Sequence, residues 1–314
     1  MKNSAKQTAE LLLSFDKITI VSHIRPDGDT LGSAFALCHA LKSMGKQVQV
    51  VCETEISPRY HFITKEKNIA KECFGKIVCV DVAAPDMAGA KYIDFAKNAD
   101  VVIDHHDTNP GYAKHNLVDG SSASCGEIMY EVISNICTIN KCIAEYLYTA
   151  ISTDTGCFVY ANTTQNTHRV AAELLSIGID IEKLNKHLFR TKTKVAFEIE
   201  KCALESLSYF YDDQIVCMLI PYELIKRLGA TEDDLEGLAS IPGQIQGVKA
   251  TATFRQTDEQ SYKLSVRTNG EIHAGEVCKL FNGGGHKMAA GCNLKGEYPE
   301  LAKMFAEKLY ENLK

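Results

Sequence analysis

Three short apolar runs in the first third of the chain each end abruptly in ionisable side chains. The runs cover residues 18–21, 77–80 and 101–103, and runs of this length predict buried strands. Open α/β sheets bind ligands at the carboxyl ends of their strands, so the side chains after these runs predict one shared site. They are His23, Asp27 and Asp29 after the first run, Asp81 after the second, and Asp104, His105 and His106 after the third.

Helical patterns alternate with these strands over the first half of the chain. Residues 30–44 carry apolar side chains at helical spacing and stop at Gly45, and Asp29 or Thr30 is the expected N-cap. A further strand is expected at 47–52. Alternation of this kind predicts a mainly parallel, doubly wound sheet. Further helices are expected at residues 124–136, 144–151 and 169–177.

The pattern changes after about residue 185. Residues 186–207 are polar with a helical pattern, and short β-type runs mixed with helices follow them. The expected strands lie at 215–220, 248–255 and 262–268, and the expected helices at 222–228, 274–281 and 299–313. The predicted organisation is therefore an N-terminal domain over residues 1–186, a helical linker over 187–208 and a smaller α/β domain over 209–314.

Composition limits the classes of protein that this chain can belong to. Its 314 residues are 45% hydrophobic and 24% charged, as in ordinary globular proteins. No apolar stretch approaches the roughly 20 residues that span a bilayer, and residues 1–7 lack the apolar core of a signal peptide. We therefore expect a cytoplasmic protein with no membrane partner. The twelve cysteines are scattered without a C-x-x-C motif, which favours reduced, buried thiols.

The net charge of −6 bears on nucleic-acid binding. Proteins that hold long duplexes neutralise many phosphates and are usually basic, so long duplex DNA is not an expected partner. A short anionic substrate held by metal ions and a few Arg and Lys side chains remains compatible with this charge.

The residue types after the strands predict a metal site. His23, Asp27 and Asp29 share one loop at the spacing H-x3-D-x-D, and Asp154 directly follows a predicted helix. Any one of these aspartates alone fits a helix N-cap, but carboxylates that converge on one crevice repel unless a cation neutralises them. The converging set contains four aspartates and two histidines: His23, Asp27, Asp29, Asp81, His105 and Asp154.

Carboxylates together with imidazoles suit two divalent metal ions. Mn²⁺ is the natural candidate because imidazole is a poor Mg²⁺ ligand, and Mg²⁺ remains an alternative. The set contains no thiolate, so structural zinc is not expected. Two metals roughly 3.5–4 Å apart would activate a water molecule and stabilise an attacked phosphorus centre.

The ordered motifs resemble those of the DHH phosphoesterase superfamily, and the C-terminal motifs resemble its DHHA1 substrate-binding domain. The first set stands at residues 22–29, 80–81, 104–106 and 153–156. The second set stands at residues 265–267, 283–286 and 289–291. The resemblance covers nearly the whole chain. In size and layout it is greatest to the NrnA group, bacterial nanoRNases that also act as phosphatases on 3′-phosphoadenosine 5′-phosphate (pAp).

The resemblance implies a role for each residue of the first domain. His23 and Asp27 would bind the first metal, and Asp81 would bridge both metals. The second metal would be bound by Asp29, His105 and Asp154. His106 would be a catalytic group that contacts phosphate or assists proton transfer. Asp104 would be a catalytic group that orients an imidazole ring.

The resemblance also implies a substrate-binding group in the second domain. Gly283, Gly284 and Gly285 would present backbone N–H groups to a phosphate. His286 and Arg267 would add charge-assisted hydrogen bonds. A tight turn explains the glycines equally well when they are considered alone.

The resemblance implies a two-metal phosphoesterase that hydrolyses short single-stranded oligoribonucleotides to mononucleotides and pAp to AMP. A cyclic di-AMP or pApA phosphodiesterase would have the same two domains. A RecJ-type exonuclease would carry further domains, and a manganese pyrophosphatase would lack the Gly-Gly-Gly-His segment. A non-catalytic nucleotide sensor would be expected to have lost metal ligands. The sequence leaves open the polarity of digestion, the physiological metal and whether the chain forms a homodimer.

Overall fold

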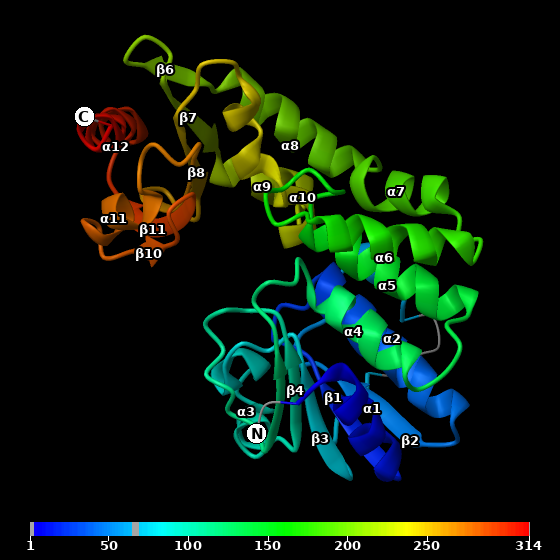
Figure 1. Ribbon diagram of the computed structural model, residues 1–314. Helices are drawn as coiled ribbons and strands as arrows, with labels where there is room; N and C mark the ends of the chain where they lie inside the picture. Colours follow the sequence, from blue (N-terminus) through cyan, green and yellow to red (C-terminus); the bar gives the residue numbers. More distant parts are fainter. Residues whose placement is uncertain (1–2, 65–68, 314) are drawn as a thin grey trace. The chain divides into compact units, whose positions relative to one another are not determined.

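The computed structural model describes residues 3–64 and 69–313. It consists of two compact units, Met1–Thr191 and Lys192–Lys314 (Figure 1). Each unit has its own sheet and its own hydrophobic core, so the expected α/β architecture is confirmed. No helix in the described residues has the length and apolar character that crossing a membrane requires.

The first unit is built on a five-stranded, wholly parallel sheet with the order β2-β1-β3-β4-β5. In this order the connections reverse direction between β1 and β3, and α/β sheets bind ligands at such switch points. The strands are β1 (Lys17–Val21), β2 (Gln47–Val51), β3 (Lys76–Val80), β4 (Val101–Asp104) and β5 (His115–Val118).

Helices cover both faces of this sheet because alternate strand residues point to opposite sides. Ile18 and Ile20 of β1 pack into the larger core with α1, α2, α4 and α5, whereas Val21 packs on the other side with α3 (Figure 1). The helices of the unit are α1 (Ala5–Ser14), α2 (Gly28–Ser43), α3 (Ile93–Lys97), α4 (Cys125–Ser134), α5 (Lys141–Asp154), α6 (Gln165–Ser176) and α7 (Ile181–Phe189). Short 3₁₀ turns lie at Pro58–Tyr60 and Pro85–Ala88.

Helices α2 and α5 pack closely because α2 carries glycine where the two backbones meet. A Cβ atom on Gly32 would lie 2.4 Å from the carbonyl oxygen of Tyr146, and one on Gly28 would lie 2.3 Å from the Thr153 hydroxyl oxygen. The start of α2 is therefore pressed against the end of α5. This packing brings Asp29 of α2 and Asp154 of α5 to one end of the sheet.

The second unit is a six-stranded sheet with the order β10-β11-β9-β8-β7-β6, antiparallel except for the β7–β8 pair. Its strands are β6 (Ser208–Phe210), β7 (Ile215–Ile220), β8 (Ala250–Gln256), β9 (Ser261–Thr268), β10 (Gly284–Gly285) and β11 (Ala289–Lys295). Its helices are α8 (Lys194–Glu205), α9 (Tyr222–Leu228), α10 (Glu232–Leu235), α11 (Ala274–Lys279) and α12 (Tyr298–Glu311). One face packs on α11 and α12, and the other on α8 and α9.

Several elements differ from the sequence expectation. Asp27 caps α2, not Asp29 or Thr30, and both of those residues lie inside the helix. Strands β5 and β11 lay outside the expected elements because their short segments lack a run of β-branched residues. Within the expected linker, residues 187–208, α7 ends and α8 begins.

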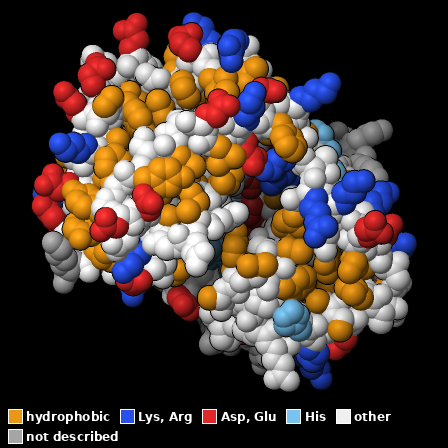
Figure 2. Space-filling model, turned by 90° about the horizontal axis from the view of Figure 1, so that it is seen from above, with side chains coloured by type: hydrophobic (Ala, Val, Ile, Leu, Met, Phe, Trp, Pro, Cys, Tyr) orange, Lys and Arg blue, Asp and Glu red, His pale blue; other side chains and the backbone are white. Residues whose placement is uncertain are grey.

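The surface carries charges of both signs. Figure 2 shows acidic and basic side chains interspersed with hydrophobic ones on the face that it draws. This mixture fits the net charge of −6.

Candidate metal centre

The loop after β1 places His23 beside Asp27. Asp27 Oδ1 accepts hydrogen bonds of 3.0 Å from the backbone N–H groups of Asp29 and Thr30, which fixes the carboxylate at the start of α2. His23 Nε2 lies 3.8 Å from Asp27 Oδ1. One aspartate therefore both caps the helix and faces an imidazole.

Asp81 follows β3 and occupies the middle of the site. Its backbone is left-handed, with φ of 58°, and its N–H donates to Ile103 O at 2.9 Å. Its Oδ2 accepts a hydrogen bond from the Thr30 hydroxyl and lies 3.7 Å from His23 Nε2. Its Oδ1 is buried and has no hydrogen-bond partner among the described residues, although His105 Nε2 lies 3.6 Å from it.

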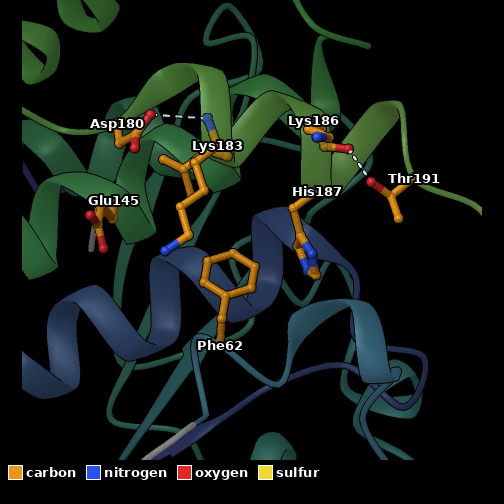
Figure 3. Close-up of a pocket in the computed structure, with 8 residues that line it drawn as sticks. Phe62, Glu145, Asp180, Lys183, Lys186, His187 and Thr191 are labelled. Atoms are coloured by element: carbon orange, nitrogen blue, oxygen red, sulfur yellow. Dashed lines mark hydrogen bonds between the residues drawn. The ribbon is translucent and has the colours of Figure 1, made fainter.

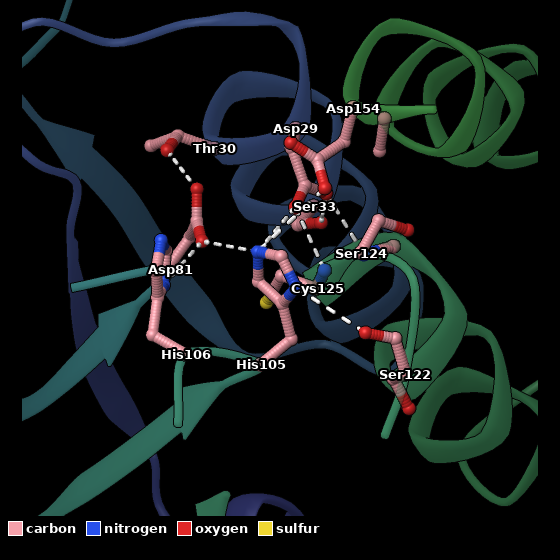
Figure 4. A network of polar contacts seen from close by, with 12 residues as sticks. Asp29, Thr30, Ser33, Asp81, His105, His106, Ser122, Ser124, Cys125 and Asp154 are labelled. Carbon is pink, nitrogen blue, oxygen red and sulfur yellow. Dashed lines mark hydrogen bonds and ion pairs between the residues drawn. The ribbon is translucent and has the colours of Figure 1, made fainter. Parts of the chain in front are cut away.

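The His105 imidazole is held by a backbone carbonyl. Its Nδ1 lies 3.4 Å from Ser122 O, which favours a proton on Nδ1 and leaves the lone pair of Nε2 free (Figure 4). Nε2 lies 3.6 Å from Asp29 Oδ2 and 3.8 Å from Asp154 Oδ2. These contacts turn His105 Nε2 toward three carboxylates.

Asp29 is fixed by the start of α4. Its Oδ2 accepts from the Cys125 N–H at 2.7 Å, and its Oδ1 accepts from the Gly126 N–H at 2.9 Å and from the Ser33 hydroxyl at 3.2 Å (Figure 4). The positive end of a helix favours a carboxylate there. Burial, followed by the negative charges of Asp81 and Asp154, nevertheless raises the pKa of Asp29 well above its ordinary value.

Asp154 ends α5 and is the most exposed of the three aspartates that face His105. Asn162 Nδ2 lies 3.4 Å from Asp154 Oδ2 and donates to Asp154 O at 3.2 Å and to Ala123 O at 2.9 Å. Burial raises the pKa of Asp154 to about 6, against the opposing effect of His105.

His106 pairs with Asp104. His106 Nδ1 lies 2.8 Å from Asp104 Oδ1, and Asp104 also accepts from the His105 N–H at 2.9 Å and from Asn109 Nδ2 at 2.6 Å. The hydrogen bond to Asp104 raises the pKa of His106 to about 9. Burial alone would raise the pKa of Asp104, but the hydrogen bonds from His106 and Asn109 hold it below its ordinary value.

The expected ligands lie in groups of three residues, called triads below. Each residue of a triad offers one potential ligand atom, and the three atoms lie within 4.8 Å of one another. The triads are His23, Asp27 and Asp81; Asp29, His105 and Asp154; and Asp81, His105 and His106. The first two match the two expected metal sites, and Asp81 faces both through different oxygens.

These residues fit divalent metal ions on chemical grounds. Burial and neighbouring carboxylates raise the pKa values of Asp29, Asp81 and Asp154, so protein groups leave their negative charges poorly balanced. The buried Asp81 Oδ1 also lacks a donor among the described residues. A divalent cation would supply both missing interactions.

The expected substrate-binding residues form a group of their own in the second unit. Arg267 lies on β9, where Nη1 donates to Val266 O at 3.0 Å, and the side chain lines a cavity of about 90 Å³. Strand β11 pairs Ala289 with Arg267 and Ala290 with Gly285, so the glycine hairpin lies one strand away from Arg267.

Packing accounts for part of the glycine run. A Cβ on Gly283 would lie 2.3 Å from Gly291 O, and Gly285 has φ of +146°. The Gly283 N–H donates to Cys278 O, and the His286 N–H donates to Ala289 O, so these two donors are used inside the unit. Gly284 is exposed, with open space over it, and the His286 side chain is also exposed.

A separate cavity of about 300 Å³ lies in the first unit, and no residue of the triads lines it. Phe62 and His187 line it with their rings in edge contact, with centroids 5.3 Å apart (Figure 3). Lys183 and Glu145 extend into the same space (Figure 3).

Sequence reasoning did not identify the groups that position the triads. Asn162 lies outside the motifs that the sequence singles out, and Thr30 is predicted only as an N-cap. The backbone donors of Cys125 and Gly126 and the Ser122 carbonyl carry no side-chain signal, so no motif could have revealed them.

Each of the two units matches the model of a known protein family. A family model described as the DHH family, N-terminal domain, matches residues 17–151, and one described as the DHHA1 domain matches residues 214–313. Among curated proteins, the chain is similar to the "Bifunctional oligoribonuclease and PAP phosphatase NrnA" of Thermus thermophilus. The two are 31% identical over 298 residues, which cover 92% of this chain and 87% of that protein.

Two further relatives cover almost the full length. The protein of the same description from Bacillus subtilis is 27% identical over 303 residues, which cover 94% of this chain and 93% of that protein. Among solved structures, an exopolyphosphatase-related protein from Bacteroides fragilis has a TM-score of 0.84 at 26% identity, and 98% of this chain and 95% of that chain are covered.

Proposed function

The chain belongs to the DHH family and carries a DHHA1 domain, and from that membership we propose that it is a two-metal phosphoesterase. It hydrolyses short oligoribonucleotides to mononucleotides and converts pAp to AMP. The observation that carries this proposal is Asp81, whose two carboxylate oxygens face His23 on one side and His105 on the other. The relatives named as oligoribonuclease and PAP phosphatase supply the substrate class.

His23, Asp27 and Asp81 would hold one divalent ion, and Asp29, His105, Asp154 and Asp81 the other. When bound, such ions lower the pKa of water and offset negative charge at phosphorus. We assign Mn²⁺ because each triad contains imidazole as well as carboxylate.

The protein groups around the ligands hold them in fixed orientations. The N–H groups at the start of α4 hold both oxygens of Asp29, and the Ser122 carbonyl sets the His105 tautomer. Ligands fixed in this way need little rearrangement when substrate arrives, which lowers the free-energy cost of reaching the transition state.

His106 is the group that acts on the substrate side. Asp104 holds its Nδ1 and leaves Nε2, the far nitrogen of the ring, to donate a hydrogen bond. We assign that donor to a phosphate oxygen or to the oxygen that leaves. We also assign Arg267 and His286 of the second unit to binding of a substrate phosphate.

The test is hydrolysis of a series from di- to pentaribonucleotides, with a long RNA, pAp, pApA and cyclic di-AMP as further substrates. Mn²⁺ should support activity better than Mg²⁺, and EDTA should abolish it. We expect Asp81→Ala to lose activity by several orders of magnitude. Asp94→Ala removes an exposed carboxylate that pairs with Lys97 and should leave activity unchanged.

Three outcomes would contradict parts of the proposal. Equal rates on long and short RNA would exclude selection for short substrates. Full activity of Asp81→Ala would exclude the two-metal assignment. Faster hydrolysis of cyclic di-AMP than of linear pApA would favour a cyclic-dinucleotide phosphodiesterase instead.

A further inference from the structure

The chain turns sharply just after Asp154, in a segment with an unusual backbone. Gly156, Cys157 and Phe158 all have left-handed backbones, with φ of 55°, 58° and 67°. Left-handed geometry is unfavourable for Cys and Phe because each carries a Cβ atom. Residues 155–160 are called the Tyr160 turn below.

The Tyr160 turn is fixed at several points. The N–H groups of Val159 and Tyr160 both donate to Thr155 O at 3.0 Å. Phe158 stacks on His168 with ring centroids 5.4 Å apart. Such contacts can hold a strained backbone in place, and strain of this kind clusters at functional sites.

The strained turn carries an aromatic ring back over the end of α5. A Cβ atom on Gly156 would lie 2.4 Å from Tyr160 Cζ and 2.6 Å from both Cε atoms, so the hydroxyl end of the ring rests over the glycine. Tyr160 is nevertheless 60% exposed and its neighbour Val159 is 79% exposed. The turn therefore does not serve to bury these side chains.

The segment that carries the ring is attached to a residue of the candidate metal centre. Gly156, beneath the ring, is two residues after Asp154. Asn162, two residues after Tyr160, places its amide 3.4 Å from Asp154 Oδ2. Both ends of the segment that carries the ring are thus attached to Asp154.

We propose that Tyr160 is the surface on which a base of the substrate stacks beside the metal centre. The inference rests on the proposed function, since a phosphate held by the triads carries its nucleoside into the surrounding space. Exposed aromatic rings bind bases of any identity because every base has a π face. An enzyme that degrades short RNA to mononucleotides needs such tolerance.

Three variants separate stacking from other roles of the side chain. Tyr160→Leu keeps an apolar side chain but removes the ring, and Tyr160→Phe keeps the ring but removes the hydroxyl. Val159→Ala is the matched control because it alters the exposed neighbour in the same turn. Thermal unfolding of each variant checks that the turn remains folded.

The substrates are pApA and two dinucleotides in which one or the other adenine is replaced by hydrogen. Tyr160→Leu should lower kcat/KM on pApA by about tenfold or more, as base–aromatic stacking predicts. The loss should disappear on the dinucleotide that lacks the stacked base. Tyr160→Phe and Val159→Ala should stay within about twofold of the unchanged protein, because each keeps the ring.

Binding without turnover provides an independent measurement. A hydrolysis-resistant dinucleotide containing 2-aminopurine, with Mg²⁺, should lose fluorescence on binding to the unchanged protein and to Tyr160→Phe but not to Tyr160→Leu. No hydrolysis of any substrate by the unchanged protein would refute the proposed function, and the fluorescence would still test stacking. An equal loss on all three dinucleotides, or no loss on pApA, would refute the stacking role alone.

Discussion

The carboxylate of Asp29 accepts a hydrogen bond of 2.7 Å from the backbone N–H of Cys125, which lies 96 residues further along the chain. This contact joins the start of α2 to the start of α4 through a residue of the metal centre. Asp29 therefore supports the fold as well as the candidate chemistry, whereas no backbone N–H group of the described residues donates to the Asp154 carboxylate.

The two aspartates should differ in their effect on stability. Asp29→Ala leaves the buried N–H groups of Cys125 and Gly126 without an acceptor, which costs about 2–4 kcal/mol of the free energy of unfolding. Both Asp29→Ala and Asp154→Ala also remove one of the mutually repelling carboxylates, so the difference between the two variants isolates the contact with α4. Asp154→Ala should change it by less than about 1 kcal/mol. Urea denaturation in EDTA measures both without bound metal, and equal losses would show that the α4 contact contributes nothing particular.

Asn162 should act through Asp154 and not on the substrate. Asn162→Ala removes the amide near Asp154 Oδ2, so the Mn²⁺ concentration for half-maximal activity should rise about 10–100-fold. Activity at saturating Mn²⁺ should largely recover. Asn135→Ala, which alters an exposed amide bonded to Glu131 O, is the control and should show no shift. A loss of activity that excess Mn²⁺ does not restore would contradict the positioning role.

Metal binding should stabilise the first unit. Mn²⁺ offsets the repulsion among Asp29, Asp81 and Asp154, so it should raise Tm, by the equivalent of about 2.7 kcal/mol at a concentration 100 times Kd. Asp81→Ala should lose most of this shift because the two proposed ion sites lose the carboxylate that faces both of them. Differential scanning fluorimetry with and without EDTA measures it, and an unchanged shift in the variant would exclude Asp81 as a bridging ligand.

Asp100 should make stability depend on pH in the acid range. Burial alone would raise the pKa of Asp100, but hydrogen bonds from Lys114, the Ile77 N–H and Lys76 hold it below its ordinary value. A depressed folded-state pKa contributes stability above the unfolded pKa of about 4, and that stability is lost as the pH falls through the folded value. The unchanged protein should therefore exceed Asp100→Asn in stability above about pH 5, with the difference fading below about pH 4. A difference that does not vary with pH would refute this account.

Replacing Gly32 with alanine should destabilise the protein although alanine has the highest helix propensity. Alanine is favoured over glycine inside a helix by about 1 kcal/mol, but here its Cβ would lie 2.4 Å from Tyr146 O and 2.9 Å from Ala150 N. We expect Gly32→Ala to lower the free energy of unfolding by about 1–3 kcal/mol. Gly243→Ala is the control, because the nearest atom to its Cβ would be 4.0 Å away. A stabilised Gly32→Ala would show that α2 and α5 can separate without cost.

The sequence predicted the fold class and the grouping of the candidate ligands because each ligand is a side chain at the end of a strand or helix. The apolar runs and the ordered motifs therefore predict where each ligand lies in the fold. That these residues bind metal, and that Arg267 and His286 bind substrate, stay predictions.

The sequence could not predict the parts that depend on the backbone. The left-handed φ of Asp81 and the donors at the start of α4 arise only when distant segments pack together. The predicted N-cap of α2 was wrong. Asp27 and Asp29 are equally good N-cap residues by type, and only the geometry of the loop determines that Asp27 is the cap. Strand β11 begins Ala289-Ala290-Gly291, which has no strand signal until β9 lies beside it.

The contact between Asp29 and the start of α4 also bears on how the protein is made. Synthesis proceeds from the N-terminus, so a chain that has reached only Asp81 has its shared carboxylate but neither α4 nor α5. The donors that fix Asp29 arrive with Cys125 and Gly126, and the last residue of the second triad arrives with Asp154. The entropy cost of closing the long loop between Asp29 and Cys125 arises before the stabilising contacts form, and this order slows folding. The candidate centre is therefore assembled only after about half of the chain has been synthesised, and shorter nascent chains cannot bring all of its triads together.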